Sequence, residues 1–195
     1  METVSYASLL LQIATGVGLA AVTGLRAFLP AFVVGVLGRL DWIPLRGGFE
    51  WLESIPALVI FGTAFILEIL ADKIPGVDHF LDVTGTVVKP AVGALVMVAS
   101  LTDLPPLYAA VIGLLLGGSV SGSVHFAKAG LRAISTGATG GTANPIVSAT
   151  EDGLSLSGSL LAVFFPVLFF LILIATALLL FYFLQRRKPR LRPES

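Results

Sequence analysis

The sequence has 195 residues, of which 56% are hydrophobic and only 12% are charged, and its formal net charge is zero. Soluble domains carry about 25% charged residues, so a chain with this composition and a mean hydropathy of +0.96 has too few polar side chains for a water-facing surface. The composition excludes an ordinary soluble domain, a disordered chain and a nucleic-acid-binding protein, and it indicates an integral membrane protein.

Apolar segments follow one another along the chain. Residues 3–25 and 153–185 contain no charged residue, and each is long enough to cross a bilayer core of about 30 Å as a helix. Residues 55–71 and 104–127 form two further apolar segments, and residues 24–38 and 84–102 form two shorter ones. We expect an all-α integral membrane protein with about six transmembrane or half-spanning helices, including short or broken segments near residues 24–38 and 133–145.

The charged residues indicate how these segments are oriented. Residues 186–195 contain five Lys or Arg residues and one Glu, directly after the last apolar segment. A basic segment in this position is typical of the cytoplasmic side. We therefore expect a single polytopic membrane domain over residues 1–185 and a basic cytoplasmic tail over residues 186–195. Six crossings place both termini in the cytoplasm and the connections 72–89 and 128–156 on the outer side.

Arg26 stands between the first two apolar segments, within the sequence GLRAFLP of residues 24–30. Gly24 and Pro30 favour a break in the helix, and a membrane tolerates the backbone groups freed by such a break only beside protein or water. Arg26 either extends its charge to the water at a helix end or binds an anion or a carboxylate.

Residues 68–82 hold the densest group of ionisable residues within the apolar sequence. Two pairs of acids in this stretch are each spaced four residues apart, so each pair shares one face of a helix. Such residues at membrane depth are typical of sites for a cation or a proton; the alternative is a hydrated loop in which the acids pair with nearby lysines. No ordered metal-binding pattern is present, and we expect no metal site. The candidate residues are Glu68, Asp72, Lys73, Asp78, His79 and Asp82.

Gly113, Gly117 and Gly122 recur at helical spacing in the apolar segment 104–127. Small residues at such intervals let another helix approach closely. We expect this face to pack another helix or to mediate a homodimer. Close packing brings Lys128, farther along the same helix, near its neighbours.

Residues 135–153 are rich in Gly, Thr and Ser and contain no charge before Glu151. Their glycines match no phosphate-binding motif, so we expect no nucleotide and no other cofactor. The segment is either a flexible outer loop or a re-entrant turn at Asn144-Pro145. In the second case a helix follows, with Glu151 and Asp152 in its first turn.

Several segments of the sequence together resemble a family of bacterial integral-membrane proteins known only as domain of unknown function 4126. These segments are GLRAFLP (24–30), LADKIPGVDH (70–79), KPAVGA (89–94) and STGATGGTANPIVSATEDG (135–153), with Asp82 and Gly85. The resemblance covers about residues 10–184. It implies a compact, helical, multi-pass protein of the bacterial inner membrane, and it implies no particular substrate, cofactor or catalytic residue.

The residues favour a transporter or permease for a small solute, with an outward-facing polar site. Positive charge for an anionic group would come from Arg26, Lys128 and Arg132, and the acids of residues 68–82 would couple a cation or a proton. The alternative is a membrane scaffold that binds a lipid or a partner protein without transport. We expect no enzyme activity, because the sequence has no cysteine and no GxSxG or HExxH pattern. The expected partner is the lipid bilayer, with no nucleic acid.

Overall fold

The computed structural model describes residues 5–46, 48–74 and 77–186, apart from the side chains of Asp78, His79 and Leu184. Within these residues the chain is helical and contains no strand, which confirms the all-α prediction. The elements are α1 (Tyr6–Leu25), α2 (Leu29–Arg39), the 3-10 helix η1 (Glu50–Glu53), α3 (Ile55–Ala71), α4 (Val77–Ser100), α5 (Pro106–Ile112), the π-helix η2 (Gly113–Gly118), α6 (Ser119–Thr139), α7 (Asn144–Phe164) and α8 (Pro166–Arg186).

Several of these helices have the length and composition of membrane spans. Four long apolar segments qualify within the described residues, namely Tyr6–Leu25, Phe80–Ser100, Pro106–Thr139 and Pro166–Phe183. Helices α2 and α3 are apolar but shorter. Large apolar side chains such as Leu67, Val87, Leu115 and Leu131 are exposed on the outside of the bundle. In a bilayer such side chains face lipid, so the structure is that of a membrane protein.

The long apolar run at residues 153–185 is two helices, not one. α7 ends at Phe164 and α8 begins at Pro166, with Phe165 in a non-helical conformation between them. Proline has no backbone N–H and disfavours helical geometry at the residue before it. α7 begins much earlier than expected, at Asn144, after a turn in which Gly140 and Gly141 adopt positive φ angles of 62° and 87°. The predicted break near residues 133–145 is therefore a turn that begins at Gly140.

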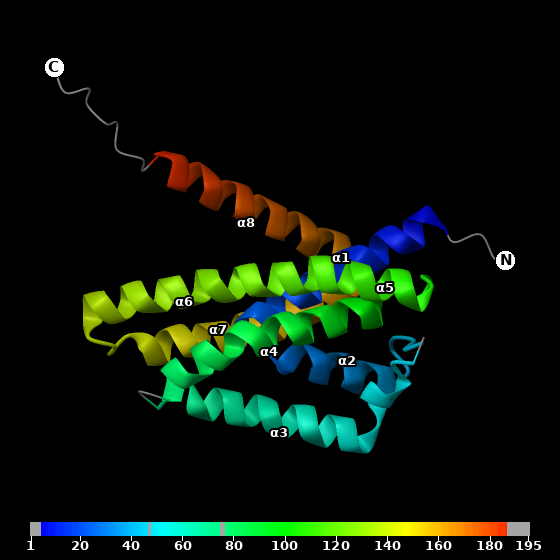
Figure 1. The fold of residues 1–195 in the computed structure, drawn as a ribbon, viewed down its shortest axis with the longest axis horizontal. Coiled ribbons are helices and arrows are strands. Elements are labelled where there is room, and N and C mark those ends of the chain that lie inside the picture. The colour runs from blue at the N-terminus through cyan, green and yellow to red at the C-terminus, as the bar shows by residue number, and fades with distance from the viewer. Residues whose placement is uncertain (1–4, 47, 75–76, 187–195) are drawn as a thin grey trace.

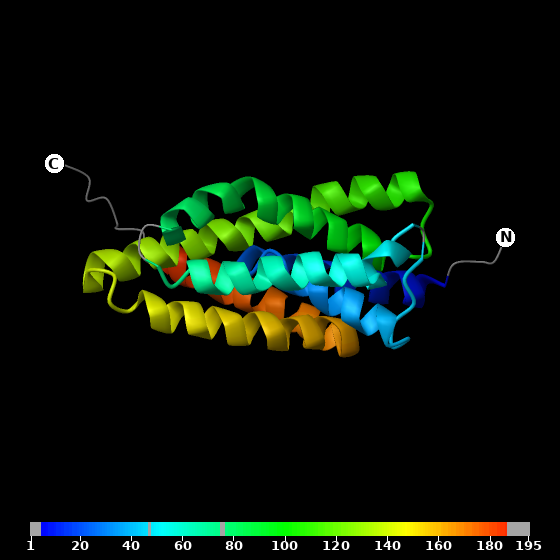
Figure 2. The same ribbon diagram turned by 90° about the horizontal axis from the view of Figure 1, so that it is seen from below.

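The helices run back and forth along the long axis of the bundle, and α1 lies at its centre, between α4, α6 and α7 (Figures 1 and 2). Because the 153–185 run folds back on itself, α1 begins and α8 ends at opposite ends of this axis (Figure 1). The first residues of α1 and the last residues of α8 therefore do not lie at one end of the bundle, as the expected topology of six crossings requires. Along the long axis, α8 ends at the same end of the bundle as the α3–α4 and α6–α7 connections (Figure 1). A cytoplasmic position for the end of α8 is therefore incompatible with an outer position for the connections 72–89 and 128–156.

The glycines of the 104–127 segment pack against α4 of the same chain. A Cβ atom added at Gly117 would lie 2.6 Å from the carbonyl oxygen of Gly93, and one added at Gly113 would clash with Val98. The expected packing face is thus present, but its partner is α4. Gly113 and Gly117 are buried there, so the contact face from which a homodimer was predicted is already occupied within the chain.

Candidate functional site

The chain between α1 and α2 turns inside the bundle. α2 has 11 residues, so it is about 16 Å long at 1.5 Å per residue, about half of a hydrocarbon core of roughly 30 Å. The break at Arg26, Ala27 and Phe28 therefore lies about half a hydrocarbon thickness from the end of α2 at Arg39. The side chain of Arg26 is 0% exposed, so this arginine does not reach the water at a helix end.

Charged side chains from other helices bind the backbone groups that the break leaves free. Glu68 of α3 accepts hydrogen bonds from the N–H groups of Ala27 (3.0 Å) and Phe28 (3.4 Å). The carbonyl oxygen of Leu25 accepts hydrogen bonds from the ammonium groups of Lys89 (3.1 Å) and Lys128 (3.0 Å). An anion at the start of α2 and cations at the end of α1 match the helix dipoles. The break is thus stabilised by charged side chains of α3, α4 and α6.

The guanidinium of Arg26 is surrounded by acceptors from α3 and α7. Nη1 lies 2.5 Å from Oδ2 of Asp72, and Nη2 lies 2.6 Å from Oδ1 of Asp152. Nη2 also donates to the hydroxyl of Ser148 at 2.9 Å. The expectation that Arg26 meets a carboxylate thus matches its position, whereas its charge is already compensated within the chain.

Arg132 and Lys128 of α6 extend the same network. Arg132 donates to both oxygens of Asp72 (3.2 and 3.0 Å) and to Glu151 (3.0 Å), and it lies 3.6 Å from Asp82. Lys128 contacts Glu151 at 2.9 Å and Asp72 at 3.7 Å. Asp72 is therefore in contact with three cations, and the network connects the α1–α2 break with α3, α4, α6 and α7.

Acids outnumber cations in this network. We define the ion network as the cations Arg26, Lys89, Lys128 and Arg132 together with the acids Glu68, Asp72, Asp82, Glu151 and Asp152. Charges buried in a low-dielectric environment are unfavourable unless opposite charges or hydrogen bonds compensate them. With four cations and five acids, the ion network is close to neutral but holds one acid in excess.

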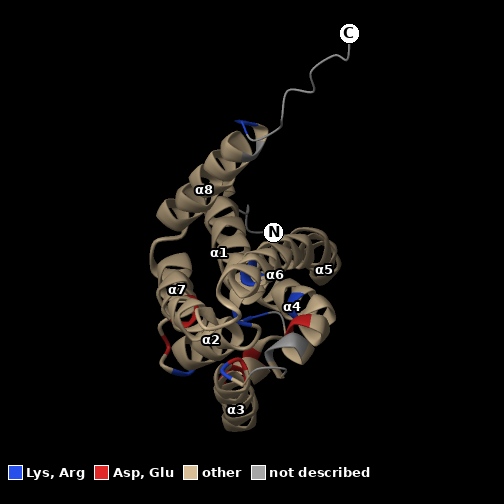
Figure 3. Cartoon of the chain, turned by 90° about the vertical axis from the view of Figure 1, so that its left-hand side faces the viewer, with Lys and Arg blue, Asp and Glu red and all other residues tan. Residues whose placement is uncertain are grey.

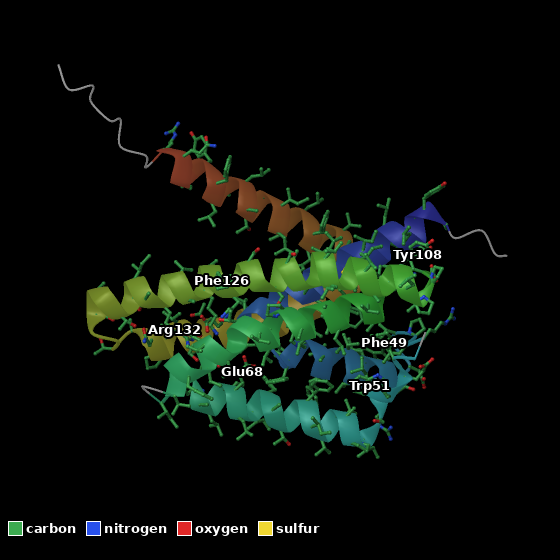
Figure 4. All side chains as sticks on the ribbon, in the orientation of Figure 1. Phe49, Trp51, Glu68, Tyr108, Phe126 and Arg132 are labelled. Atoms are coloured by element: carbon green, nitrogen blue, oxygen red, sulfur yellow. The ribbon has the colours of Figure 1, made fainter. Side chains whose placement is uncertain are left out.

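The charged residues gather in the interior of the bundle. Seen along the axis from the end at which α8 ends, several of them lie among α3, α4, α6 and α7 (Figure 3). Glu68 and Arg132 lie toward this end of the bundle, whereas Phe49, Trp51 and Tyr108 lie toward the other (Figure 4). Exposed apolar side chains such as Leu70, Val83 and Ile134 flank the ion network on the outside, so it lies within the lipid-facing belt.

A cavity of about 290 Å³ opens beside the ion network, between α3, α4 and the α1–α2 break. Its walls are mostly apolar, formed by residues such as Ala64, Leu67 and Val88. The charged residues that line it are Glu68, Asp72, Asp82 and Lys89. This cavity combines an apolar body with an acid-rich wall.

A second cavity, of about 310 Å³, lies in the opposite half of the bundle. Its lining includes Gln12 and Thr15 of α1 and Thr102 after α4. Along α4, Lys89 lines the first cavity and Ala99 the second, about 15 Å of helix apart. Val96 between them is 0% exposed. The two cavities are thus separated by a short, tightly packed apolar layer.

The structure brings most of the predicted candidate residues together, but not all of them. Lys73 is exposed at the end of α3, and Asn144 pairs with Thr136 at the α6–α7 turn, away from the ion network. The side chains of Asp78 and His79 lie outside the described part of the chain. The candidates that meet in the ion network are Arg26, Glu68, Asp72, Asp82, Lys128, Arg132, Glu151 and Asp152.

Sequence reasoning did not include Lys89 and Ser148 in the site. The signal for Ser148 is its spacing on α7, where Ser148, Glu151, Ser155 and Ser159 are three or four residues apart and all buried. Such a spacing places polar residues on one inward helix face. Among the residues that the structure describes, no group of three or more His, Asp or Glu side chains is arranged to hold a metal ion.

Comparison with known proteins identifies the family. A family model described as Domain of unknown function (DUF4126) matches residues 13–186. Searches of curated proteins and of solved structures each gave no match. Because the family model matches most of the chain, the protein belongs to the DUF4126 family.

Proposed function

We propose that this protein is a transporter or permease for a small solute, and that the ion network and its adjacent cavity form the site through which the solute passes. The observation that carries the proposal is the helix break inside the bundle, stabilised by charged side chains and open to a cavity, and we place this break at membrane depth. Transporters commonly build their sites from discontinuous helices at this depth, because irregular backbone is tolerated there only beside a cavity or other protein.

The two cavities support the same function. They lie in opposite halves of the bundle, and the layer between them consists of small or branched apolar side chains such as Leu19, Ala31 and Val96. The first cavity already adjoins the ion network, and small movements of α2 against α4 would connect the second cavity with it. Alternating access requires this arrangement of a site, two vestibules and a thin barrier.

The charged residues of the ion network and the cavity wall restrict the charge that the solute can carry. Arg26, Lys128 and Arg132 each contact acids of the ion network, so they offer an anionic solute no uncompensated charge. The cavity wall carries three acids and one lysine. A neutral or cationic solute therefore fits this wall better than the anionic group that the sequence suggested.

The tail indicates the orientation. α8 ends at Arg186 and four more basic residues follow it, and α8 ends at the end of the bundle toward which Glu68 and Arg132 lie (Figure 4). At the opposite end two arginines are present, Arg39 at the end of α2 and Arg46 in the loop after it. By the excess of basic residues on the cytoplasmic side, we place the ion-network end and the tail in the cytoplasm and the start of α1 outside. The membrane is, by the family resemblance, the bacterial inner membrane.

The second candidate is a membrane scaffold that binds a lipid or a partner protein. It is favoured by the pairing of the cations, since Arg26, Lys128 and Arg132 join α1, α3, α6 and α7 as fixed contacts would. In this case the ion network stays closed to one side of the membrane at all times.

Sided labelling distinguishes the two candidates. The chain has no cysteine, so single cysteines can be placed in the first cavity by Thr84→Cys and at the tail by Glu194→Cys. A lipid-facing control is Leu115→Cys. Each variant is treated with a membrane-impermeant maleimide from one side of oriented vesicles. A transporter predicts labelling of position 84 from both sides and of position 194 from one side only. Labelling of position 84 exclusively from the tail side would refute transport.

A further inference from the structure

We propose that Glu68 is the proton-binding residue of the ion network and that its protonation releases the α1–α2 break. This inference rests on the proposed function, because it names the coupling ion of the same site. Glu68 is buried in α3, with 8% of its surface exposed, and it lines the first cavity.

Glu68 differs from the other acids of the ion network in its partners. Asp72, Asp82, Glu151 and Asp152 each lie within 4.0 Å of an arginine or lysine nitrogen. Within the described residues, Glu68 has no such ion pair, and its carboxylate oxygens accept hydrogen bonds from the backbone N–H groups of Ala27 and Phe28. A proton on Glu68 therefore breaks no ion pair, whereas a proton on any of the other acids breaks at least one.

The ion network has room for one proton in its charge balance. The ion network has four cations and five acids, so a single proton makes it neutral. Groups that face Glu68 come from each neighbouring element: Asp72 from α3, Asp82 and Lys89 from α4 across the cavity, Arg26 from the break, and Lys128 from α6 at the carbonyl of Leu25. Phe28, the residue just before α2, contributes its backbone N–H.

Protonation changes the hydrogen bonding at the break. A proton delivered by water in the cavity forms an O–H bond with one carboxylate oxygen, and that oxygen becomes a donor. That oxygen also becomes a weaker acceptor, so the hydrogen bond from one of the two backbone N–H groups is weakened. The Phe28 N–H bond, at 3.4 Å, is longer than the Ala27 bond at 3.0 Å, so the Phe28 bond is the one that is lost first. The anion that stabilised the start of α2 is also lost. α2 is then free to move, and loss of the proton to the other side restores the starting state.

Glu68→Gln tests the inference, because glutamine has the shape of a protonated glutamate and does not titrate. The matched control is Glu50→Gln, at an exposed acid in the other half of the bundle. Glu68→Asp keeps a titratable group in place. The first measurement is pH-difference infrared spectroscopy of the purified protein, which detects a buried carboxyl gaining its proton. We expect the Glu68→Gln variant to lose one carboxyl band that Glu50→Gln and Glu68→Asp retain. An unchanged spectrum in Glu68→Gln would overturn the inference.

The second measurement is sided labelling of Thr84→Cys in acidic and alkaline buffer, with rates normalised to Glu194→Cys at the same pH. A single titrating carboxyl changes its protonated fraction roughly tenfold per pH unit on the alkaline side of its midpoint. We expect labelling from the side opposite the tail to rise in acid and to become independent of pH in Glu68→Gln. If position 84 is labelled from both sides and the labelling depends on pH as strongly in Glu68→Gln as with Glu68 present, the role of Glu68 is refuted but transport is not. If position 84 is labelled from one side only and Glu68→Gln loses the infrared band, transport is refuted but proton binding by Glu68 is not.

Discussion

Replacing Asp72 by asparagine should strongly destabilise the protein. Asp72 lies 2.5 Å from Arg26, 3.0 Å from Arg132 and 3.7 Å from Lys128, and its side chain is 3% exposed. Asparagine has nearly the same shape but no charge, so three buried cations lose their common counter-ion. Removing one partner of a buried ion pair costs about 3–5 kcal/mol. Because two arginines donate to Asp72, we expect a loss of about 3–5 kcal/mol in the free energy of unfolding.

The loss can be measured by unfolding the detergent-solubilised protein with increasing amounts of sodium dodecyl sulfate, followed by circular dichroism. Glu50→Gln is the matched control, because an exposed charge contributes only about 0–1 kcal/mol. Adding Arg132→Met to Asp72→Asn removes one of the unpaired cations. The double variant should therefore lose at least about 1 kcal/mol less than the sum of the single variants. A single Asp72→Asn variant within about 1 kcal/mol of the wild type would refute the ion network as a stabilising core.

Three further outcomes follow from the packing and the charges. Gly24→Ala adds a Cβ atom 2.5 Å from the carbonyl oxygen of Ser121, so it should push α1 away from α6 and lower the free energy of unfolding by about 1–3 kcal/mol. Its control is Gly130→Ala on α6, where the added Cβ meets open space. In the same unfolding assay this control should be neutral or stabilise the protein by up to about 1 kcal/mol. Lys89→Met removes one of two donors to the Leu25 carbonyl and should cost about 1–3 kcal/mol, whereas Lys73→Met, at an exposed position, should change stability by less than about 0.5 kcal/mol. In intact cells, Glu194→Cys should react with an impermeant maleimide only after lysis, and reaction in intact cells would reverse the proposed orientation.

Part of the fold and site was predictable because charge and helix-breaking residues carry local signals. Gly24 and Pro30 predicted a break around Arg26, and the structure has it between α1 and α2. The spacing of Glu68 and Asp72 predicted a shared helix face, and both residues line the first cavity. Their different partners were not predictable, because the backbone of the break and the cations of α6 come from distant parts of the sequence.

The number of passes was not predictable from hydropathy. The run at residues 153–185 is apolar on both sides of Pro166, and proline also occurs within intact transmembrane helices. In this chain the residue before Pro166 leaves the helical conformation and α8 folds back. In contrast, Pro90 lies inside a continuous α4. One proline thus adds a helix to the bundle, and α8 ends at the end of the bundle toward which Glu68 and Arg132 lie (Figure 4).

The most direct test of the account is labelling of Thr84→Cys from the side opposite the tail. Thr84 lines the cavity beside Glu68 and Asp82, and the buried layer around Ala31 and Val96 separates it from the second cavity. The account predicts that an impermeant maleimide reaches position 84 from that side as well as from the tail side, while Leu115→Cys in the lipid-facing surface is not labelled from either. Labelling of position 84 from the tail side alone would show that the apolar layer never opens, and would contradict a role in transport.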